Sequence, residues 1–428
     1  MPQSRGNKRL EKIFSNTSAK QRIGIKRIIS NLFYHTTHSN LELSKITEFS
    51  IPTVSALLDT LIDSNLVQPT GQGSSSGGRK PQQYGLSKTF GYIVAVYIDQ
   101  YYTHLAILSL TRQHVVEPRI INLNLYENKN GTSILCESVK QFVDDSKIDK
   151  DEIIGVGVGM PGLIDVKKGL NHTFFQDADN GIRQLLSEKL SLPVFIENDS
   201  NVLALGETKF GFAKYSQNVL VVNASWGVGL GMVLNGELFH GHAGFAGEFS
   251  HIPLNENGIL CSCGKQGCLE TECSATALAR LAKEGIRNGK MSSLSNMRDE
   301  DLEKLEAELV IEAANNGDQY SVQILWQIGY NLGKGLASLI HLLNPEVIVV
   351  SGRLAKANKY ILTPIEHSLN KYSIPRLRRS THVVISELSK EAGFMGCASL
   401  VIENVFGHTR ERFIPSGSSV PTGLLRVN

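Results

Sequence analysis

The sequence predicts an α/β protein with a smaller helical unit ahead of its main body. From residue 91 onward, strand patterns alternate with helical patterns, which is typical of α/β bodies of two lobes whose loops at strand ends form a cleft. Before that point, three short helical patterns follow one another and lead into a candidate hairpin. At 428 residues and 41% hydrophobic content, the chain is long enough for two or three domains. We place the domain boundary between residues 1–88 and 89–428.

The composition argues against a membrane or secreted protein. No apolar run in the sequence reaches the roughly 18 residues of a membrane span, and the N-terminal MPQSRGNKRLEKIF lacks the apolar core and cleavage site of a signal peptide. Six cysteines, four of them between residues 261 and 273, fit a metal loop in a reducing compartment better than a disulfide framework. We therefore expect a cytoplasmic protein with no membrane partner.

Charge is distributed unevenly along the chain. The net charge is only +2, but residues 1–88 hold 12 Lys+Arg against 5 Asp+Glu, a balance of +7. The remaining residues hold 31 against 36, a balance of −5. A basic N-terminal unit on a mildly acidic body indicates that the first part meets a polyanion. A solvated basic arm without a partner explains the same charge, and composition alone leaves both open.

Three helices are expected in the N-terminal unit. Residues 20–34 carry isoleucine and leucine mostly on one face, as in an amphipathic helix. Ser39-Asn40 is a candidate cap for a short helix over LELSKIT. Residues 50–63 begin with a serine cap and a proline in the first turn, then repeat apolar residues at helical spacing. Near the exposed start of this third helix, Thr53, Ser55 and Ala56 are small side chains that can reach base edges in a major groove.

A hairpin with a basic tip follows the third helix. Leu66-Val67 begins one strand, residues 71–78 (GQGSSSGG) form a flexible turn, and Tyr84-Gly85-Leu86 belongs to a second strand. Between them, Arg79 and Lys80 supply positive charge that can contact phosphates. The order of these parts predicts a winged helix-turn-helix that binds double-stranded DNA. The alternative for the helices alone is an ordinary three-helix packing unit.

The body is expected to contain buried strands and several helices. The strand patterns lie in two adjacent segments within 91–110 joined by a turn at 99–102, and in 153–165, 192–198, 218–239 and 345–354; the helical patterns lie in 199–207, 274–286, 300–316 and 320–343. Polar side chains at the ends of such strands meet at one edge of a cleft.

A candidate zinc site lies in GEFSHIPLNENGILCSCGKQGCLE. His251, Cys261, Cys263 and Cys268 have the spacing H-x9-C-x-C-x4-C, and three thiolates with one imidazole satisfy tetrahedral Zn²⁺ without an open position. We therefore expect a structural zinc ion that fixes the loop 251–268. Disulfides or inert thiols are the alternative, although Cys261 and Cys263 are too close in sequence to bridge each other.

Five polar residues are candidates for binding a small ligand. Asn198 and Asp199 stand where a strand stops and a helix starts, a position in which a helix N-cap is the alternative interpretation. Glu248, His251 and Glu270 lie in or beside the zinc loop. Three carboxylates, an amide and an imidazole suit a polyhydroxyl ligand, since each hydroxyl both donates and accepts hydrogen bonds.

Four motifs give the chain a family resemblance. CSCGKQGCLE at 261–270, IENDSNVLALGE at 196–207, GVGMPGLID at 157–165 and GEFSH at 247–251 resemble the motifs of the ROK family of repressors and sugar kinases, over roughly residues 20–405. The resemblance implies an actin-like two-lobed sugar-kinase fold with a zinc loop, and in the regulators an N-terminal winged helix.

The resemblance also implies roles for the candidate site residues. The sugar site would comprise Asn198, Asp199, Glu248, His251 and Glu270, with His251 also binding zinc. In the kinases of the family, the aspartate that matches Asp199 is the general base that takes a proton from the sugar hydroxyl. The family's G-E-x-G-H is here Gly247 to His251, with Ser250 at its fourth position.

The two phosphate-binding turns of the kinases are altered in this chain. D-x-G-x-T appears as Asp99 to Thr103 with Tyr101 in place of glycine, and G-T-G-x-G appears as Ser225 to Gly229 with Trp226 in place of threonine. Bulky rings stand where the backbone must approach phosphate. ATP is therefore not expected to be a substrate, and VSGRL at 350–354 is an ordinary strand-to-helix turn.

We expect a sugar-responsive transcriptional repressor of carbohydrate-utilisation genes rather than an enzyme. Its partners would be a DNA operator, a sugar or sugar phosphate related to a hexose or amino sugar, and further copies of itself in a homodimer or homotetramer. The alternatives are an ATP-dependent sugar kinase that uses Asp199, and a DNA-binding protein whose pocket has lost its ligand. The tail after residue 408 has no functional interpretation.

Overall fold

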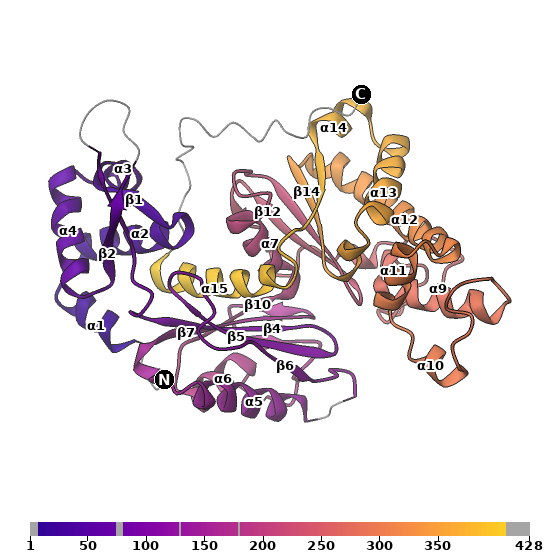
Figure 1. Ribbon diagram of the computed structural model, residues 1–428, viewed down its shortest axis with the longest axis horizontal. Coiled ribbons are helices and arrows are strands. Elements are labelled where there is room, and N and C mark those ends of the chain that lie inside the picture. Colours follow the sequence, from indigo (N-terminus) through magenta and orange to yellow (C-terminus); the bar gives the residue numbers. More distant parts are fainter. Residues whose placement is uncertain (1–6, 74–79, 128–129, 179, 408–428) are drawn as a thin grey trace.

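The computed structural model describes residues 7–73, 80–127, 130–178 and 180–407. A small N-terminal unit is followed in the chain by a body that contains two five-stranded sheets (Figure 1). The two-lobed α/β architecture predicted from the sequence is confirmed. None of the helices in the described part of the chain has the length and apolar character of a bilayer span.

The N-terminal unit consists of four helices and a three-stranded antiparallel sheet. The elements are α1 (Lys8–Ser15), α2 (Ala19–His35), β1 (Thr37–Ser39), α3 (Asn40–Thr47), α4 (Ile51–Asp63), β2 (Val67–Gln72) and β3 (Gln82–Leu86), with the strand order β1-β3-β2. Ser18, Ser39 and Ser50 each accept a hydrogen bond from the backbone N–H three residues later, which fixes where three of the helices begin. The three predicted helices and the hairpin are present, whereas α1 and β1 were not predicted.

The first sheet of the body has the strand order β10-β7-β4-β5-β6. Its strands are β4 (Tyr92–Ile98), β5 (Tyr102–Ser109), β6 (Arg119–Asn122), β7 (Ile153–Met160) and β10 (Val194–Asn198). Because side chains alternate along a strand, Val94 and Val96 face a core with α5 (Gly131–Asp145) and α6 (Ile182–Leu190), whereas Ile93 and Ala95 face the C-terminal helix α15 (Glu391–Phe406).

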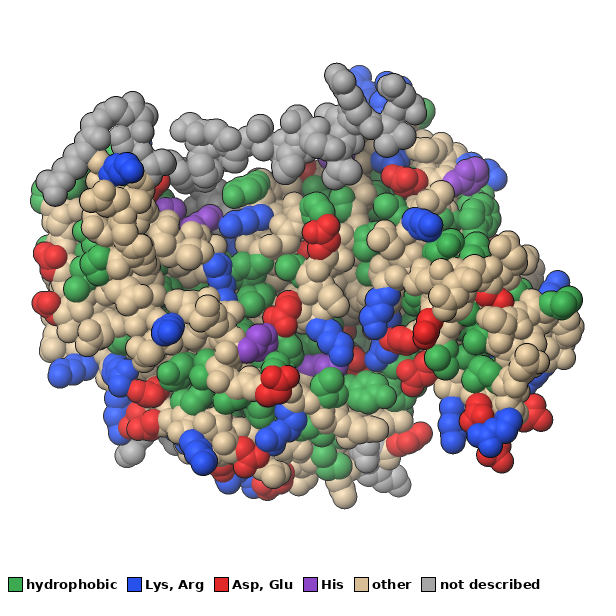
Figure 2. Space-filling view, in the orientation of Figure 1, with side chains coloured by type: hydrophobic (Ala, Val, Ile, Leu, Met, Phe, Trp, Pro, Cys, Tyr) green, Lys and Arg blue, Asp and Glu red, His purple; other side chains and the backbone are tan. Residues whose placement is uncertain are grey.

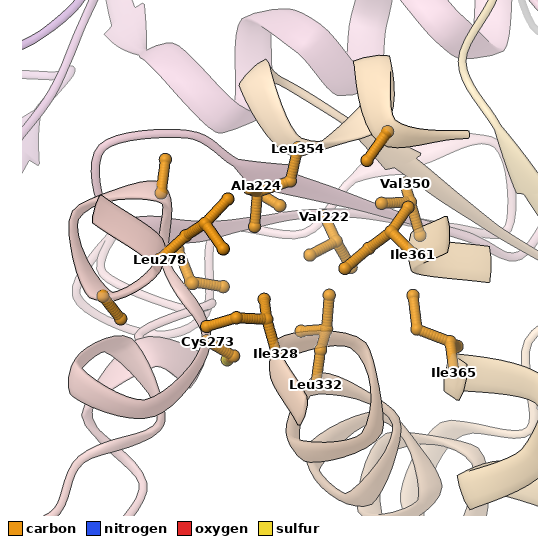
Figure 3. Close-up of a cluster of buried hydrophobic side chains, with 14 of the residues drawn as sticks. Val222, Ala224, Cys273, Leu278, Ile328, Leu332, Val350, Leu354, Ile361 and Ile365 are labelled. Atoms are coloured by element: carbon orange, nitrogen blue, oxygen red, sulfur yellow. The ribbon is translucent and has the colours of Figure 1, made fainter. Parts of the chain in front are cut away.

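The second sheet has the strand order β13-β12-β11-β14-β15. Its strands are β11 (Val219–Ala224), β12 (Val228–Leu234), β13 (Glu237–Leu238), β14 (Val347–Ser351) and β15 (His382–Ile385). One face packs on α7 (Asp199–Phe210). The other packs on α8 (Leu269–Cys273), α9 (Ala275–Arg287), α11 (Ala307–Asn315), α12 (Gln319–Leu343) and α13 (Lys359–Tyr372). Figure 3 shows this core, in which Val222 and Ala224 face Ile328 and Leu332 of α12.

One predicted helix is divided in the structure. Residues 300–316 form α10 (Asp299–Glu303) and α11, because the chain turns after α10 and buries both Leu302 and Leu305 in the core between the second sheet and its helices.

The remaining short elements are η1 (Lys150–Glu152), β8 (Ile164–Asp165), β9 (Leu170–Asn171), η2 (Phe249–His251), η3 (Arg353–Ala357) and α14 (Pro375–Ser380).

Helices α7 and α15 cross closely in the middle of the molecule (Figure 1). Glycine is required at this crossing: a Cβ on Gly206 would lie 2.2 Å from the Ala392 carbonyl oxygen, and one on Gly396 would lie 1.9 Å from that of Val202. Helix α7 begins at the end of β10 in the first sheet and packs on β11 and β12 of the second. It is therefore in contact with both lobes.

The N-terminal unit packs directly on the body. One buried cluster continues from Ile28 and Phe33 of α2 to Val401 and Phe406 of α15. The Arg112 guanidinium donates hydrogen bonds to the carbonyl oxygens of Phe33 and Tyr34 at 2.9 and 3.1 Å, near the C-terminus of α2, where a cation is favourable. The unit is therefore attached by packed side chains as well as by its covalent connection.

Candidate functional site

Four metal-binding side chains converge in the loop before α8. One ligand atom each from His251, Cys261, Cys263 and Cys268 lies within 4.8 Å of all the others. His251 Nδ1 is 3.6 Å from Cys261 Sγ, and Cys263 Sγ is 3.6 Å from Cys268 Sγ. Tetrahedral Zn²⁺ at its usual bond lengths holds such atoms about 3.5–3.8 Å apart. The donor set and its spacing therefore fit a closed zinc site.

The alternatives to a metal are less compatible with this geometry. The described cysteines are free thiols, and the Cys263–Cys268 separation is far longer than a disulfide bond. Burial, first, and then the neighbouring sulfurs of Cys263 and Cys261 together raise the pKa of Cys268 to about 12. A divalent cation is the group that lets three adjacent sulfurs ionise together.

His251 connects the cysteine cluster to the carboxylate of Glu248. Its Nδ1 faces Cys261, and its Nε2 lies 3.7 Å from Glu248 Oε2. The preceding Gly247 has φ of 99°, a left-handed conformation that turns the chain into η2. Ser250 is buried in η2 without a positive φ, so its side chain imposes no backbone strain where the family carries glycine.

Asn198 and Asp199 lie together where β10 ends and α7 begins. Asn198 is the N-cap of α7, since its Oδ1 accepts hydrogen bonds from the amides of Ser200 and Asn201, and its Nδ2 donates to the Gly162 carbonyl at 3.2 Å. Asp199 accepts from the Ser200 amide at 2.8 Å and from Asn223 Nδ2 at 3.0 Å. Capping and ligand binding are therefore compatible, because capping uses only one side of the amide.

The environment of Asp199 raises the pKa of its carboxyl group. Burial raises its pKa to about 6, and the negative charges of Asp99 and Glu248 contribute to the same shift. A carboxyl group with this pKa can exchange a proton near neutral pH or accept a hydrogen bond from a hydroxyl.

Glu270 is held against the turn between β11 and β12. It follows Cys268 by two residues on α8, and its Oε2 accepts a hydrogen bond from the Val228 amide at 3.4 Å. A Cβ on Gly227 would lie 2.3 Å from this oxygen, so a larger residue there would displace the Glu270 carboxylate. Burial raises the pKa of Glu248, and Glu270 acts in the same direction. The carboxylates of Asp199, Glu248 and Glu270 thus belong to one acidic region.

Sequence reasoning did not find Glu197 and His240. Glu197 is buried at the end of β10 and accepts hydrogen bonds from His240 Nε2 at 2.8 Å and from Asn201 Nδ2 at 3.0 Å. It also accepts from the Asn198 amide at 2.8 Å, so it orients the start of α7. The sequence signal that could have identified Glu197 is a glutamate near the end of an otherwise apolar strand, directly before Asn198.

The two altered turns come from different lobes and are in direct contact. Asp99 Oδ1 accepts hydrogen bonds from the amides of Tyr101 and Tyr102 at 2.8 Å, which closes the β4–β5 turn. The ring of Tyr101 contacts the ring of Trp226 edge-to-face, with centroids 4.4 Å apart. The Arg353 guanidinium lies 3.8 Å from the centre of the same indole. Residues 350–354 do form a strand-to-helix turn, as expected, but the role of Arg353 was not predicted.

The candidate DNA-contacting residues lie on α4 and the hairpin. Thr53 and Ser55 are half-buried, with Thr53 Oγ1 2.8 Å from Ser50 Oγ and Ser55 Oγ accepting from Asn40 Nδ2 at 2.5 Å. Ala56 and Lys80 are exposed, whereas Arg79 lies outside the described residues.

The surface of the body carries charges of both signs. Figure 2 shows acidic and basic side chains mixed along the lower edge of the molecule and around α10, and the outline is indented between these two regions.

Comparison with known proteins gives a consistent group of relatives. A sequence model of the ROK family matches residues 104–404. The chain is 29% identical over 387 residues to a xylose repressor from Bacillus spizizenii, covering 90% of this chain and 96% of the repressor. A glucokinase from Halalkalibacterium halodurans is 36% identical over 276 residues, or 63% of this chain and 82% of the glucokinase. The crystal structure of a ROK family transcriptional regulator, a homolog of the E. coli MLC protein, matches with a TM-score of 0.74 and 24% identity over 90% of this chain and 97% of that chain.

Proposed function

This chain belongs to the ROK family, and we propose that it is a DNA-binding transcriptional regulator that responds to a sugar. It represses carbohydrate-utilisation genes, and sugar binding changes its affinity for the operator or the arrangement in which it binds the operator. The observation that carries the proposal is the aromatic contact between Tyr101 and Trp226, because it fills the place where a kinase of this family binds phosphate. The near-full-length match to a protein named xylose repressor supports the same role.

The proposed effector site comprises Asn198, Asp199, Glu248, His251 and Glu270. Carboxylate oxygens accept hydrogen bonds from sugar hydroxyls, while an amide and an imidazole can donate to them. Support comes from the convergence of these groups from β10, η2 and α8 on one acidic region.

Zinc is proposed as a structural ion held by His251, Cys261, Cys263 and Cys268. When bound, it would supply a rigid tetrahedral centre and no open coordination position. With Nδ1 committed to the metal, His251 presents Nε2–H beside Glu248, and Glu270 is fixed two residues after the last thiolate. The ion therefore organises ligands of the sugar without contacting the sugar.

DNA binding is assigned to a winged helix in residues 1–88, with residues 89–428 as the sensing part. Helix α4 would enter the major groove with Thr53, Ser55 and Ala56 near its exposed end, and Arg79 and Lys80 would contact phosphates. The +7 charge balance of residues 1–88 supports this assignment. A single winged helix makes few base contacts, so a dimer or tetramer on paired half-sites is expected.

Helix α7 offers a physical route from the sugar to the DNA-binding unit. Its first residue, Asp199, lies in the proposed effector site, and its last, Phe210, contacts Phe33 and Tyr34 of α2 with ring centroids 6.1 and 5.8 Å apart. A sugar that favours one arrangement of the lobes would shift α7 and with it the spacing of two winged helices.

A sugar kinase is the second candidate, because Asp199 has the position and the raised pKa of a general base. It predicts ATP-dependent phosphorylation of a hexose that Asp199→Asn abolishes. Absence of turnover in the native protein together with sugar-dependent DNA binding would exclude it.

The deciding experiment is fluorescence anisotropy of labelled DNA from upstream of the gene and its neighbours, across a salt series and with a panel of sugars. Tight, sequence-selective binding that one sugar alters supports the proposal. Lys80→Ala should weaken binding to all sequences and reduce the slope of log K against log salt concentration by about one. Lys167→Ala changes an exposed lysine of the body and should leave both quantities unchanged. Weak, non-selective binding without a sugar effect would contradict the proposal.

A further inference from the structure

We infer that Tyr101, Trp226 and Arg353 restrict the effector to an unphosphorylated sugar. This inference rests on the proposed sugar site and names the chemical class of its ligand. The three side chains come from the β4–β5 turn, the β11–β12 turn and η3, so both lobes contribute to the wall that they form.

The wall is packed rather than open. Trp226 is only 9% exposed, with Tyr101 against one side and the Arg353 guanidinium over its ring at 3.8 Å. The wall lies beside the proposed sugar ligands. Asn223, which donates a hydrogen bond to Asp199, stands near the end of β11, and Gly227, which lies close to the Glu270 carboxylate, directly follows Trp226. Closely packed side chains on this side would oppose a phosphate carried by the bound sugar.

Arg353 is the cation in this wall, and its charge is already paired with carboxylates. One of its nitrogens lies 3.5 Å from Asp99 Oδ2, and another bonds Glu308 Oε1. Asp99 also approaches His104 at 3.5 Å, and Glu308 also pairs with Lys356 at 3.6 Å. Two carboxylates shared among these groups leave no surplus positive charge for an incoming phosphate.

The rest of the site is negative. Asp199, Glu248 and Glu270 are carboxylates, and a zinc ion with three thiolates and one neutral imidazole carries a net charge of about −1. A phosphate with a charge near −2 would meet like charges in a partly dehydrated cleft, where they are poorly screened. Neutral sugar hydroxyls, by contrast, donate hydrogen bonds to carboxylates without repulsion.

The test is isothermal titration of the full-length, zinc-loaded protein with matched probes. The probes are D-xylose, D-glucose with its 1- and 6-phosphates, and N-acetyl-D-glucosamine with its 6-phosphate. We expect one unphosphorylated sugar to bind about a hundredfold more tightly than any of the phosphates.

A variant pair tests the role of the Arg353 charge. Glu308→Gln removes one of the two carboxylates that pair with the Arg353 guanidinium. The ratio of the Kd for the sugar phosphate to the Kd for the parent sugar should therefore fall about tenfold. Glu312→Gln, an exposed glutamate one turn later on α11, should leave it unchanged. An unchanged preference in Glu308→Gln would overturn the electrostatic part of the inference.

The outcomes separate the inference from its premise. Tighter binding of a sugar phosphate than of its parent sugar overturns the inference while the proposed sugar-responsive function stands. Binding of none of the probes overturns both, because the premise of a sugar site then fails as well.

Discussion

His251 has two tasks at the residue scale, because its two nitrogens face different groups. Nδ1 lies 3.6 Å from Cys261 Sγ, and Nε2 lies 3.7 Å from Glu248 Oε2. A metal bound on one side fixes the ring orientation and hence the donor presented on the other. Metal binding and sugar binding should therefore fail together.

Cys263→Ser is expected to abolish both properties. Loss of one thiolate removes a ligand from a closed four-coordinate site, so zinc content after dialysis should fall from about one ion per chain to near zero. The sugar effect on DNA binding should disappear at the same time. Cys136→Ser, on α5 outside the loop, is the control and should retain both. A sugar response that survives without zinc would mean that the loop does not organise the site.

Asp199 should make stability depend on pH. Because its folded-state pKa is raised from 3.8 to about 6, its contribution to stability is present below pH 4 and is lost as the pH rises through 6. A shift of about two pH units corresponds to about 3 kcal/mol. The free energy of unfolding of Asp199→Asn minus that of the native protein should therefore grow by about this amount between pH 4 and 7.

Urea unfolding of both proteins at several pH values measures this difference. Subtracting one protein from the other at each pH cancels the pH dependence of metal binding, which both share. A difference that stays constant across the range would show that Asp199 titrates normally.

At the element scale, α7 joins the proposed sugar site to the N-terminal unit. It has 12 residues and is therefore about 18 Å long. Glycine at its crossing with α15 allows close backbone packing, so a displacement at one end is not absorbed by flexible side chains. At the other end, Phe210 lies under the Arg112 guanidinium at 5.1 Å as well as against two rings of α2.

Phe210→Ala should uncouple sugar binding from DNA binding. The variant loses the ring contacts with α2 but none of the proposed sugar ligands, so sugar affinity should stay within about threefold while the sugar effect on DNA binding disappears. Partial burial of the ring predicts a loss of about 2 kcal/mol in unfolding free energy. Titration calorimetry with anisotropy measures both properties.

Phe212→Ala is the matched control, because this ring is two residues further along and 47% exposed. It should change neither sugar affinity nor the DNA response. Retention of the full sugar response in Phe210→Ala would exclude α7 as the route.

At the scale of the whole molecule, helix α7 contacts both sheets, and the N-terminal unit continues the core of the first lobe. The proposed winged helix occurs once in each chain, whereas repression of an operator with paired half-sites needs two. We expect a species of twice the 46.9 kDa chain mass in sedimentation velocity at micromolar concentration. Its affinity for an operator with one half-site removed should fall at least about a hundredfold. A monomer that binds a single half-site equally well would contradict this expectation.

The sequence alone predicted most of the elements, the four side chains that cluster in the loop 251–268, and the family. Periodicity located α2, α3 and α4, because apolar spacing and serine caps are local signals. The donors of the proposed zinc site lie close together in the chain, so their clustering could be predicted from spacing, and the family resemblance is confirmed.

Only the tertiary structure decided which distant residues meet. Arg353 lies about 250 residues from Tyr101, and no local pattern predicts that its guanidinium covers Trp226. Glu197 and His240 form a pair for the same reason. Glu197 lies in β10 of the first sheet and His240 follows β13 of the second, so the packing of the two lobes, not sequence spacing, places Nε2 and Oε2 2.8 Å apart. The sequence gives the chemistry of each side chain directly. The contacts among Tyr101, Trp226 and Arg353, and the proposed route along α7, depend instead on how two sheets and two crossing helices pack.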